Sequence, residues 1–209
     1  MFSPFPDSLQ HLYQTIKPQI HERLESFRSV PTNEYFYELC FCICTPMTKA
    51  KNAIQVQKKL MEQNFRECDI DLYEIIRGTN HYIRFHNKKI IYLQKMKNKF
   101  STYEKEIHSN KDIFSLRNYL ANTIEGLSFK EASHFLRNIG RTGVAIIDRH
   151  TFRNLQQLSV INPTEKYPGS KSSYLQIESL WKHYADFVGI SMEEMDLLFF
   201  YNQTKTILK

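Results

Sequence analysis

Glycine and proline are scarce in this chain. Its 209 residues include 6 glycines, of which none precedes Gly78, and 7 prolines, of which none lies between residues 47 and 162. Sandwiches, barrels and doubly wound sheets need frequent glycine and proline turns. The scarcity therefore argues against those folds and favours a mostly helical one.

Long hydrophobic runs and a targeting signal are also missing. No stretch of about 18 apolar residues could form a transmembrane helix. The N-terminal sequence MFSPFPD has neither the basic start nor the apolar stretch of a signal peptide. We therefore expect a soluble, intracellular protein in which the four cysteines are reduced.

Apolar and basic residues are plentiful. Hydrophobic residues make up 42% of the chain and charged residues 24%, which allows a sizeable core. The length predicts one domain, or one domain in two lobes. The formal net charge of +6 indicates an anionic partner, either nucleic acid or an acidic membrane surface, without choosing between them.

Apolar periodicity, caps and breakers predict helices along most of the chain. Asp7 can cap the first helix, and Pro18 should interrupt or kink it. Residues 144–147 form a short extended apolar run. The predicted helices are residues 7–27, 34–44, 47–64, 69–77, 86–100, two helices within 102–125, then 129–138, 148–158, 174–188 and a last helix from Ser191.

The turn at residues 126–128 joins two of these helices around Gly126. A helix, a glycine-containing turn and a second helix form the outline of a helix-hairpin-helix. This is a DNA-binding unit whose turn directs backbone N–H groups at a phosphate. Helical proteins contain many such joints, so a plain structural role stays open at this point.

Lys130 and Asp148 lie on either side of a reversal of the chain. The helix from Lys130 to Asn138 rises about 12 Å at ~1.5 Å per residue. Five extended residues after the turn at residues 140–143 can return about 16 Å at ~3.3 Å each. Asp148 can therefore come back beside Lys130, with both residues at helix N-termini.

Such a pair is capable of chemistry. Burial at a helix N-terminus favours a neutral, nucleophilic Lys130 amine. The Asp148 carboxylate, held ionised as an N-cap, can face a developing positive charge. In the alternative interpretation Asp148 is only a cap and Lys130 is a solvated residue of the first helical turn.

Two segments carry a specific family resemblance. Residues 126–138 read GLSFKEASHFLRN, and residues 144–150 read VAIIDRH. They closely resemble the helix-hairpin-helix–GPD DNA glycosylases and, more narrowly, the second class of 8-oxoguanine DNA glycosylases of archaea and some bacteria. Residues 36–46, 84–87 and 195–209 also fit, so the resemblance covers nearly the whole chain.

The resemblance implies an all-α, two-lobed fold with the active site in the cleft between the lobes. Residues 1–209 would form a single glycosylase unit, with the hairpin at about 112–139 and a second lobe built from the N- and C-terminal helices. Lys130 would be the Schiff-base nucleophile that displaces 8-oxoguanine, and Asp148 the essential carboxylate. The strand would then be cut by β-elimination.

The resemblance also implies partners and location. No metal and no organic cofactor takes part in these steps. The partner is double-stranded DNA containing 8-oxoguanine, with no membrane involved. We expect a monomer in the cytoplasm or at the nucleoid.

The base pocket is expected to contain Phe200, Lys209 and Phe85. The family typically has tryptophan where Phe200 stands, and Phe200 can still stack on a base over a smaller area. The chain stops at Lys209 after an apolar pair, so we expect this end to be docked, and the resemblance places it at the base pocket. 8-Oxoguanine has an N7–H donor where guanine has an acceptor, so a fixed acceptor near N7 would discriminate between them.

DNA contacts are predicted at the hairpin and in a basic stretch. Family hairpins usually carry a second glycine where Ser128 stands. Residues 75–103 contain no acidic residue and form either a solvated helix face or a wall that follows the phosphates. The residues predicted to bind DNA are Gly126, Ser128, Arg137, Arg149, Arg84, Lys95, Lys97 and Lys99.

Three cysteines, Cys40, Cys42 and Cys44, alternate within one predicted helix. On a helix Cys42 points nearly opposite to the other two, so the three cannot close a tetrahedral metal site. Core packing is the better interpretation. Iron–sulfur members of the superfamily need clustered cysteines after the catalytic carboxylate, and no cysteine follows Cys68.

Two alternatives remain for the function. The first is a non-catalytic helix-hairpin-helix DNA-binding module in which Lys130 only contacts a phosphate. The second is a related glycosylase with another base preference, since specificity lies in the pocket and not in the catalytic pair. Borohydride trapping separates the first from an enzyme, because only an enzyme forms a covalent Lys–DNA adduct.

Overall fold

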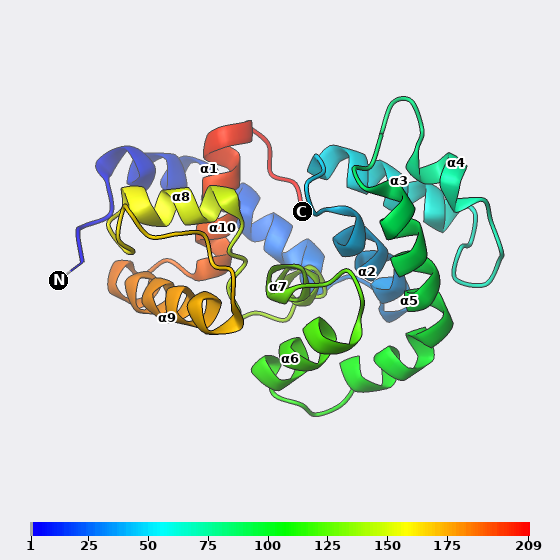
Figure 1. The fold of residues 1–209 in the computed structure, drawn as a ribbon. Coiled ribbons are helices and arrows are strands. Elements are labelled where there is room, and N and C mark those ends of the chain that lie inside the picture. The colour runs from blue at the N-terminus through cyan, green and yellow to red at the C-terminus, as the bar shows by residue number, and fades with distance from the viewer. Residues whose placement is uncertain (1) are drawn as a thin grey trace. The chain divides into compact units, whose positions relative to one another are not determined.

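The computed structural model describes residues 2–209, and within them every regular element is a helix (Figure 1). This confirms the prediction of an all-α fold. The helices are α1 (Asp7–Arg28), α2 (Tyr35–Cys44), α3 (Ala50–Glu62), α4 (Leu72–Ile76), α5 (His86–Ile107), α6 (Ile113–Thr123), α7 (Phe129–Asn138), α8 (Arg149–Gln157), α9 (Lys171–Val188) and α10 (Met192–Thr204), with a short 3-10 helix at Thr32–Glu34. None of them is long and apolar enough to cross a membrane.

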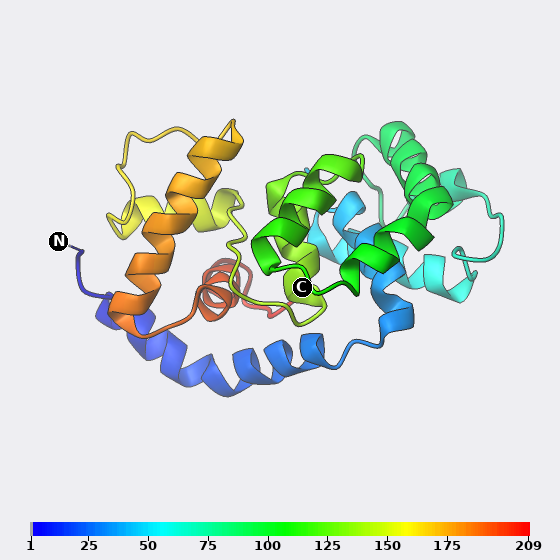
Figure 2. The ribbon, with the colours of Figure 1, turned by 90° about the horizontal axis from the view of Figure 1, so that it is seen from below.

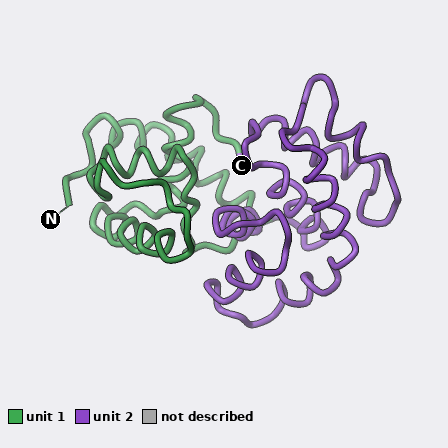
Figure 3. The backbone as a smooth tube through the Cα atoms, viewed as in Figure 1, with its two compact units in different colours: residues 1–29, 140–208 green, residues 30–139, 209 purple. Residues whose placement is uncertain are grey.

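The chain forms two compact units (Figure 3). Unit 1 comprises the residues up to 29 together with 140–208, and so contains α1 and α8–α10. Unit 2 comprises residues 30–139 together with Lys209, and so contains α2–α7. The hairpin before α7 therefore lies in unit 2, whereas the segment that leads to Asp148 lies in unit 1.

Unit 2 is built around α2, which packs against α3, α5 and α7. All of α2 except its first residue is buried, and this confirms that Cys40, Cys42 and Cys44 belong to the core. Burial raises the pKa of all three thiols, that of Cys44 to about 12. They are therefore protonated, inert core residues at neutral pH.

Unit 1 is built around α10, which packs against α1, α8 and α9. Ser191 and Glu194 form the capping box that starts α10, as the sequence predicts. The Glu194 side chain also ties α10 to α1, because its Oε1 accepts a hydrogen bond from Tyr13 Oη (2.8 Å) and lies 2.7 Å from His21 Nε2.

The sequence predicts that Pro18 interrupts or kinks the first helix, and the structure excludes the interruption. α1 continues through Pro18 for 22 residues, and Figure 2 shows a helix that curves along its length. Pro18 cannot donate to the carbonyl four residues earlier, that of Gln14. Both residues are exposed, so water can satisfy that carbonyl and the helix need not end.

The predicted boundary after residue 100 is also wrong. α5 runs on to Ile107, because Phe100, Tyr103 and Ile107 continue the buried stripe that begins with Leu93. Only one helix, α6, then fills the rest of the stretch to Glu125, and the carboxylate of Asp112 caps it. α3 starts at Ala50 instead of Met47, since Met47 has a positive φ of 57° that ends helical geometry there.

Candidate functional site

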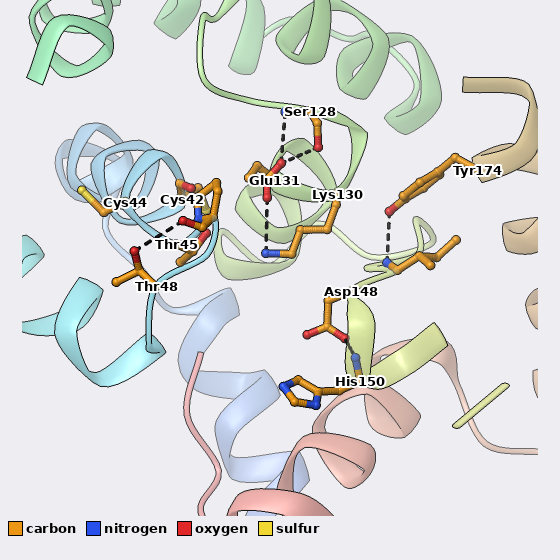
Figure 4. A network of polar contacts seen from close by, with 12 residues as sticks. Cys42, Cys44, Thr45, Thr48, Ser128, Lys130, Glu131, Asp148, His150 and Tyr174 are labelled. Carbon is orange, nitrogen blue, oxygen red and sulfur yellow. Dashed lines mark hydrogen bonds and ion pairs between the residues drawn. The ribbon is translucent and has the colours of Figure 1, made fainter. Parts of the chain in front are cut away.

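The two residues singled out for chemistry, Lys130 and Asp148, belong to different units. Each is therefore described within its own unit (Figure 4).

Lys130 is the second residue of α7, directly after the hairpin turn. Gly126 has a φ of +92°, and a Cβ atom placed on it would lie 2.6 Å from the ring of Tyr92 in α5. The turn thus requires glycine for both its conformation and its close packing. Ser128 is the N-cap of α7 and forms a capping box with Glu131.

Glu131 connects this cap to Lys130. Its Oε2 accepts hydrogen bonds from the backbone N–H (3.1 Å) and the hydroxyl of Ser128. Its Oε1 lies 3.5 Å from Lys130 Nζ. The Lys130 side chain is only 17% exposed, so the amine is held against a carboxylate in a largely buried position.

Further titratable groups surround Lys130. The pKa of Lys89 is lowered to about 8, chiefly by burial; the charge of Lys130 adds to this lowering, whereas Cys44 and Glu131 oppose it. Burial and the nearby cations Arg137 and Lys130 hold the pKa of His134 well below its ordinary value. His134 is therefore neutral at pH 7, one helical turn after Lys130 on α7.

Lys89 is an inward-facing residue of the predicted basic stretch. Its Nζ donates to the carbonyl oxygens of Cys44 (2.8 Å) and Pro46 (2.7 Å) and to Thr48 Oγ1 (3.1 Å). These contacts fix the turn between α2 and α3. The sequence predicts that residues 75–103 form a solvated face or a wall along the phosphates, but Lys89 within this stretch is buried.

Lys209 docks on a buried carboxylate of unit 2. Its Nζ donates to Glu38 Oε1 and to Gln57 Oε1 (2.8 Å) and lies 5.2 Å from the centre of the Phe41 ring. Glu38 also accepts hydrogen bonds from Gln57 Nε2 (2.8 Å) and Asn138 Nδ2 (3.0 Å). The side chain of residue 209 is thus fixed within unit 2, as expected for a docked end.

Asp148 is the N-cap of α8 in unit 1, as the sequence predicts. Its Oδ1 accepts from the backbone N–H groups of His150 (2.8 Å) and Thr151 (2.7 Å). Both cap hydrogen bonds end on this one oxygen, so Oδ2 lies outside the cap. The partial positive charge of the helix N-terminus lies next to this side chain.

The remaining predicted residues differ in accessibility. Phe85 is 55% exposed with a φ of +58°, and the guanidinium of Arg84 lies 5.5 Å from its ring centre. Arg149 is exposed at the start of α8, and Phe200 is partly buried near the end of α10. Arg137 is only 2% exposed, so its guanidinium is not presented at the surface of unit 2.

The three lysines on α5 also differ. Lys99 is exposed. Lys95 Nζ pairs with Glu125 at 2.7 Å and is still half exposed. Lys97 Nζ pairs with Asp69 at 2.9 Å, donates to the carbonyl of Cys68, and has a side chain that is 13% exposed.

Sequence reasoning missed the residues that hold the predicted ones in place. Glu38 carried a signal that could have been used, because it is a lone carboxylate within a very apolar helix and so needs a buried partner. Tyr174 and Glu178 on α9, which bind the backbone just before Asp148, gave no such signal.

Comparisons with known proteins cover almost the whole chain. A family model described as 8-oxoguanine DNA glycosylase matches residues 20–190. The chain is 35% identical to a protein of Fusobacterium nucleatum named 8-oxoguanine DNA glycosylase/AP lyase, over 97% of both chains. It is 34% identical to a protein of the same name from Methanocaldococcus jannaschii, over 93% of both.

Solved structures agree in fold. The crystal structure of the 8-oxoguanine DNA glycosylase of Thermotoga maritima has a TM-score of 0.84 at 28% identity, covering 97% of both chains. The Methanocaldococcus jannaschii 8-oxoguanine glycosylase/lyase in complex with a 15mer DNA containing 8-oxoguanine has a TM-score of 0.85 at 32% identity. That match covers 96% of this chain and 97% of the other.

Proposed function

Because the chain belongs to the 8-oxoguanine DNA glycosylase family, we propose that it removes 8-oxoguanine from DNA and then cuts the strand at the resulting site. In this proposal Lys130 is the nucleophile and Asp148 the carboxylate that assists it. The observation that carries the assignment is the placement of Lys130. A largely buried amine stands at the second residue of α7, behind the glycine turn, within the segment that carries the family resemblance.

The reaction follows from amine chemistry. The neutral Lys130 amine attacks C1′ of the damaged nucleotide, the bond from C1′ to N9 breaks, and 8-oxoguanine leaves with the electron pair of that bond and takes up a proton. The nitrogen then passes its one remaining proton to O4′ as the C1′–O4′ bond breaks and the sugar ring opens to an imine. The imine makes the C2′ proton acidic, and its removal expels the 3′ phosphate by β-elimination.

Asp148 acts on charge in this proposal. As the bond to the base breaks, the sugar gains oxocarbenium-like positive charge, which a fixed carboxylate stabilises. The support from unit 1 is that the cap occupies Oδ1 alone, so Oδ2 can face the sugar while α8 holds the side chain. Because one chain carries both groups, we also propose that the protein works as a monomer.

Base and DNA recognition are proposed for the other predicted residues. Phe85 and Phe200 would stack on bases, and the docking of the Lys209 side chain on Glu38 supports a fixed role for residue 209 in the base pocket. The hairpin turn at Gly126 and Ser128 would bind a phosphate, with Arg84, Arg149 and Lys99 as surface cations. A DNA substrate would place the protein at the nucleoid.

Borohydride trapping on duplex DNA with a single 8-oxoguanine tests this function. The wild-type protein should release the base and give a covalent protein–DNA adduct, because borohydride reduces the Lys130 imine. Lys130→Gln should give neither product and should still bind the duplex. Lys182→Gln is the matched control, since Lys182 is an exposed lysine of α9 paired with Asp186.

The results separate the alternatives. An undiminished adduct in Lys130→Gln would remove Lys130 from the mechanism. DNA binding by the wild type without base release or adduct would support the non-catalytic module instead. Parallel duplexes with other damaged bases would reveal a different base preference, as faster release from one of those duplexes than from the 8-oxoguanine duplex.

A further inference from the structure

The extended segment that leads to Asp148 pairs with side chains instead of with a strand. Residues 144–147 are buried, and buried backbone N–H and C=O groups need hydrogen-bond partners. Residues 2–209 contain no strand that could supply them. Instead, alternate N–H groups donate to side-chain oxygens of α9 and α10: Gly143 N to Glu193 Oε1 (2.6 Å), Ala145 N to Glu178 Oε1 (2.6 Å) and Ile147 N to Tyr174 Oη (3.1 Å).

Tyr174 is the member of this set that binds nearest to Asp148 along the chain. Its hydroxyl accepts from Ile147 N and donates to Ala145 O at 2.7 Å. Figure 4 shows the Tyr174 side chain and, as a dashed line, one bond of its hydroxyl. A tyrosine hydroxyl has one proton to donate, and here both its donor and an acceptor position are used. Ala145 O and Ile147 N lie on one edge of the extended chain, so the buried Tyr174 hydroxyl bridges the two. Glu178 binds Ala145 N on the same edge, and Tyr167 Oη donates to Ile147 O at 2.8 Å.

The direction of the Asp148 carboxylate depends on this edge. Ile147 immediately precedes Asp148, and Asp148 N donates back to Ile146 O at 3.1 Å. On its other side Asp148 is fixed by the N-terminus of α8 through Oδ1. The position of Oδ2 is therefore set jointly by α8 and by the path along which the chain reaches Asp148.

We propose that Tyr174 is a positioning residue for Asp148. Its hydroxyl holds the backbone at residues 145–147 and thereby aims the carboxylate at the sugar. The inference rests on the proposed function, in which Asp148 stabilises developing charge. Tyr174 acts only through Asp148, so its removal should slow base release without weakening DNA binding.

Tyr174→Phe tests this, because it removes one oxygen atom and keeps the ring. Tyr184→Phe is the matched control, since Tyr184 lies on the same helix, is buried, and has a hydroxyl without a hydrogen-bond partner among residues 2–209. The maximal single-turnover rate of base release and the enzyme concentration that gives half of it are measured well below the melting temperature of each variant.

A misplacement of a catalytic group by about 1 Å can cost about 100-fold in rate. We expect Tyr174→Phe to lower the maximal rate by about 10- to 100-fold, on that scale. The half-saturating enzyme concentration of Tyr174→Phe should stay within about twofold of the wild-type value. For Tyr184→Phe, both the maximal rate and the half-saturating concentration should stay within about twofold of the wild type. A loss of affinity with an unchanged maximal rate would overturn the inference, as would equal losses in the two variants.

A double-mutant cycle with Asp148→Asn then separates positioning from general damage. If Tyr174 acts through Asp148, adding Tyr174→Phe to Asp148→Asn should change the residual rate by less than about twofold. The same large loss in both backgrounds would overturn the inference and leave the proposed function intact. A wild-type protein that releases no 8-oxoguanine would instead overturn the proposed function itself.

Discussion

Lys130 and Asp148 are held by opposite means. The neighbours of Lys130 in unit 2 are titratable side chains, with Glu131 in contact and Lys89 and His134 within electrostatic range. The partners of Asp148 in unit 1 are backbone N–H groups, which do not titrate. The surroundings of the amine therefore change with pH, whereas those of the carboxylate depend on geometry.

The same contrast extends to how each unit is stabilised. Unit 2 buries a lysine at a cost, because desolvation disfavours its charged form. Unit 1 partly buries a carboxylate, Glu194, that gains from charge-assisted hydrogen bonds. Substitutions that act on charge alone should consequently have effects of different sign and at different pH in the two units.

The largest expected effect is a loss of base release on substitution of Asp148 in unit 1. Asp148→Asn removes the charge and keeps an amide oxygen that can still cap α8, since Asn and Asp are equally good N-caps. Base release should fall by about 100-fold or more, on the scale of losing a preorganised electrostatic group. The free energy of unfolding should fall by no more than about 1 kcal/mol.

Single-turnover kinetics and urea unfolding of the same preparation check this prediction. The rate is measured under conditions in which more than nine-tenths of the variant is folded, so that a loss of stability does not lower the measured rate of base release. If the loss of activity simply follows the loss of folded protein, Asp148 is a structural cap and nothing more.

The next largest effect is the pH dependence of the unfolding free energy that Lys89 of unit 2 causes. Burial lowers the pKa of Lys89 to about 8, well below its unfolded value. Between these two pKa values the unfolded chain binds more protons, so stability rises with pH in this window. Between pH 7 and pH 10 the unfolding free energy of the wild type should gain about 2 to 3 kcal/mol from this group, relative to Lys89→Met.

Urea titrations at several pH values measure that difference, and other titrating groups cancel because both proteins contain them. Lys89→Met should be less stable than the wild type at high pH, since it leaves the carbonyls of Cys44 and Pro46 without this donor. A constant difference across the range would mean that Lys89 stays charged in the folded state.

Unit 1 should show a smaller effect in acid, in the same direction, because a lowered pKa makes stability rise with pH here as well. Burial alone would raise the pKa of Glu194, but hydrogen bonds from Ser191, His21 and Tyr13 outweigh it and lower the pKa to about 2. The stabilisation is complete above the unfolded pKa and is lost as the pH falls from there toward 2. Relative to Glu194→Gln, the wild type should lose about 2 kcal/mol between pH 5 and pH 3.

The same urea measurements at acid pH check this value. Glu194→Asp serves as a partner variant, because it keeps the charge and shortens the reach to Tyr13 and His21. A difference between wild type and Glu194→Gln that does not change from pH 5 to pH 3 would contradict the assigned ionisation.

The sequence predicted those features of the two units that short stretches of residues determine, such as helix caps and glycine turns. α7 and α8 begin where Ser128 and Asp148 cap them, and the glycine at 126 marks the turn, so the setting of Lys130 and Asp148 along the chain was readable. The end of α5 was not, because residues 100–107 hold neither glycine nor proline and a buried stripe continues through them.

The supporting residues could not be predicted because their partners are distant in sequence. Glu38 meets Asn138 and Lys209 across 100 and 171 residues. Tyr174 on α9 reaches Ile147 and Ala145 of the extended segment across 27 and 29 residues. Capping follows a fixed spacing along the chain, whereas these contacts exist only once the helices have packed.

The smallest expected effect concerns DNA binding through α5. Each phosphate that a cation neutralises adds close to one to the slope of log K against log salt, and three freely available lysines would contribute about 3. The structure indicates that Lys95 and Lys97 contribute less than this to the slope. Lys95 already pairs with Glu125, and Lys97 is largely covered while it pairs with Asp69.

We therefore expect replacement of Lys95, Lys97 and Lys99 together by Gln to reduce the slope by about 1, with Lys99 as the main contributor. Binding should weaken equally for undamaged and 8-oxoguanine duplexes, because phosphate contacts carry no information about the base. Fluorescence anisotropy from low to moderate salt measures both quantities, and Lys99→Gln alone should give most of the change. An unchanged slope would mean that this face of α5 is solvated and takes no part in binding, so that the cations near the hairpin would have to supply the attraction to DNA.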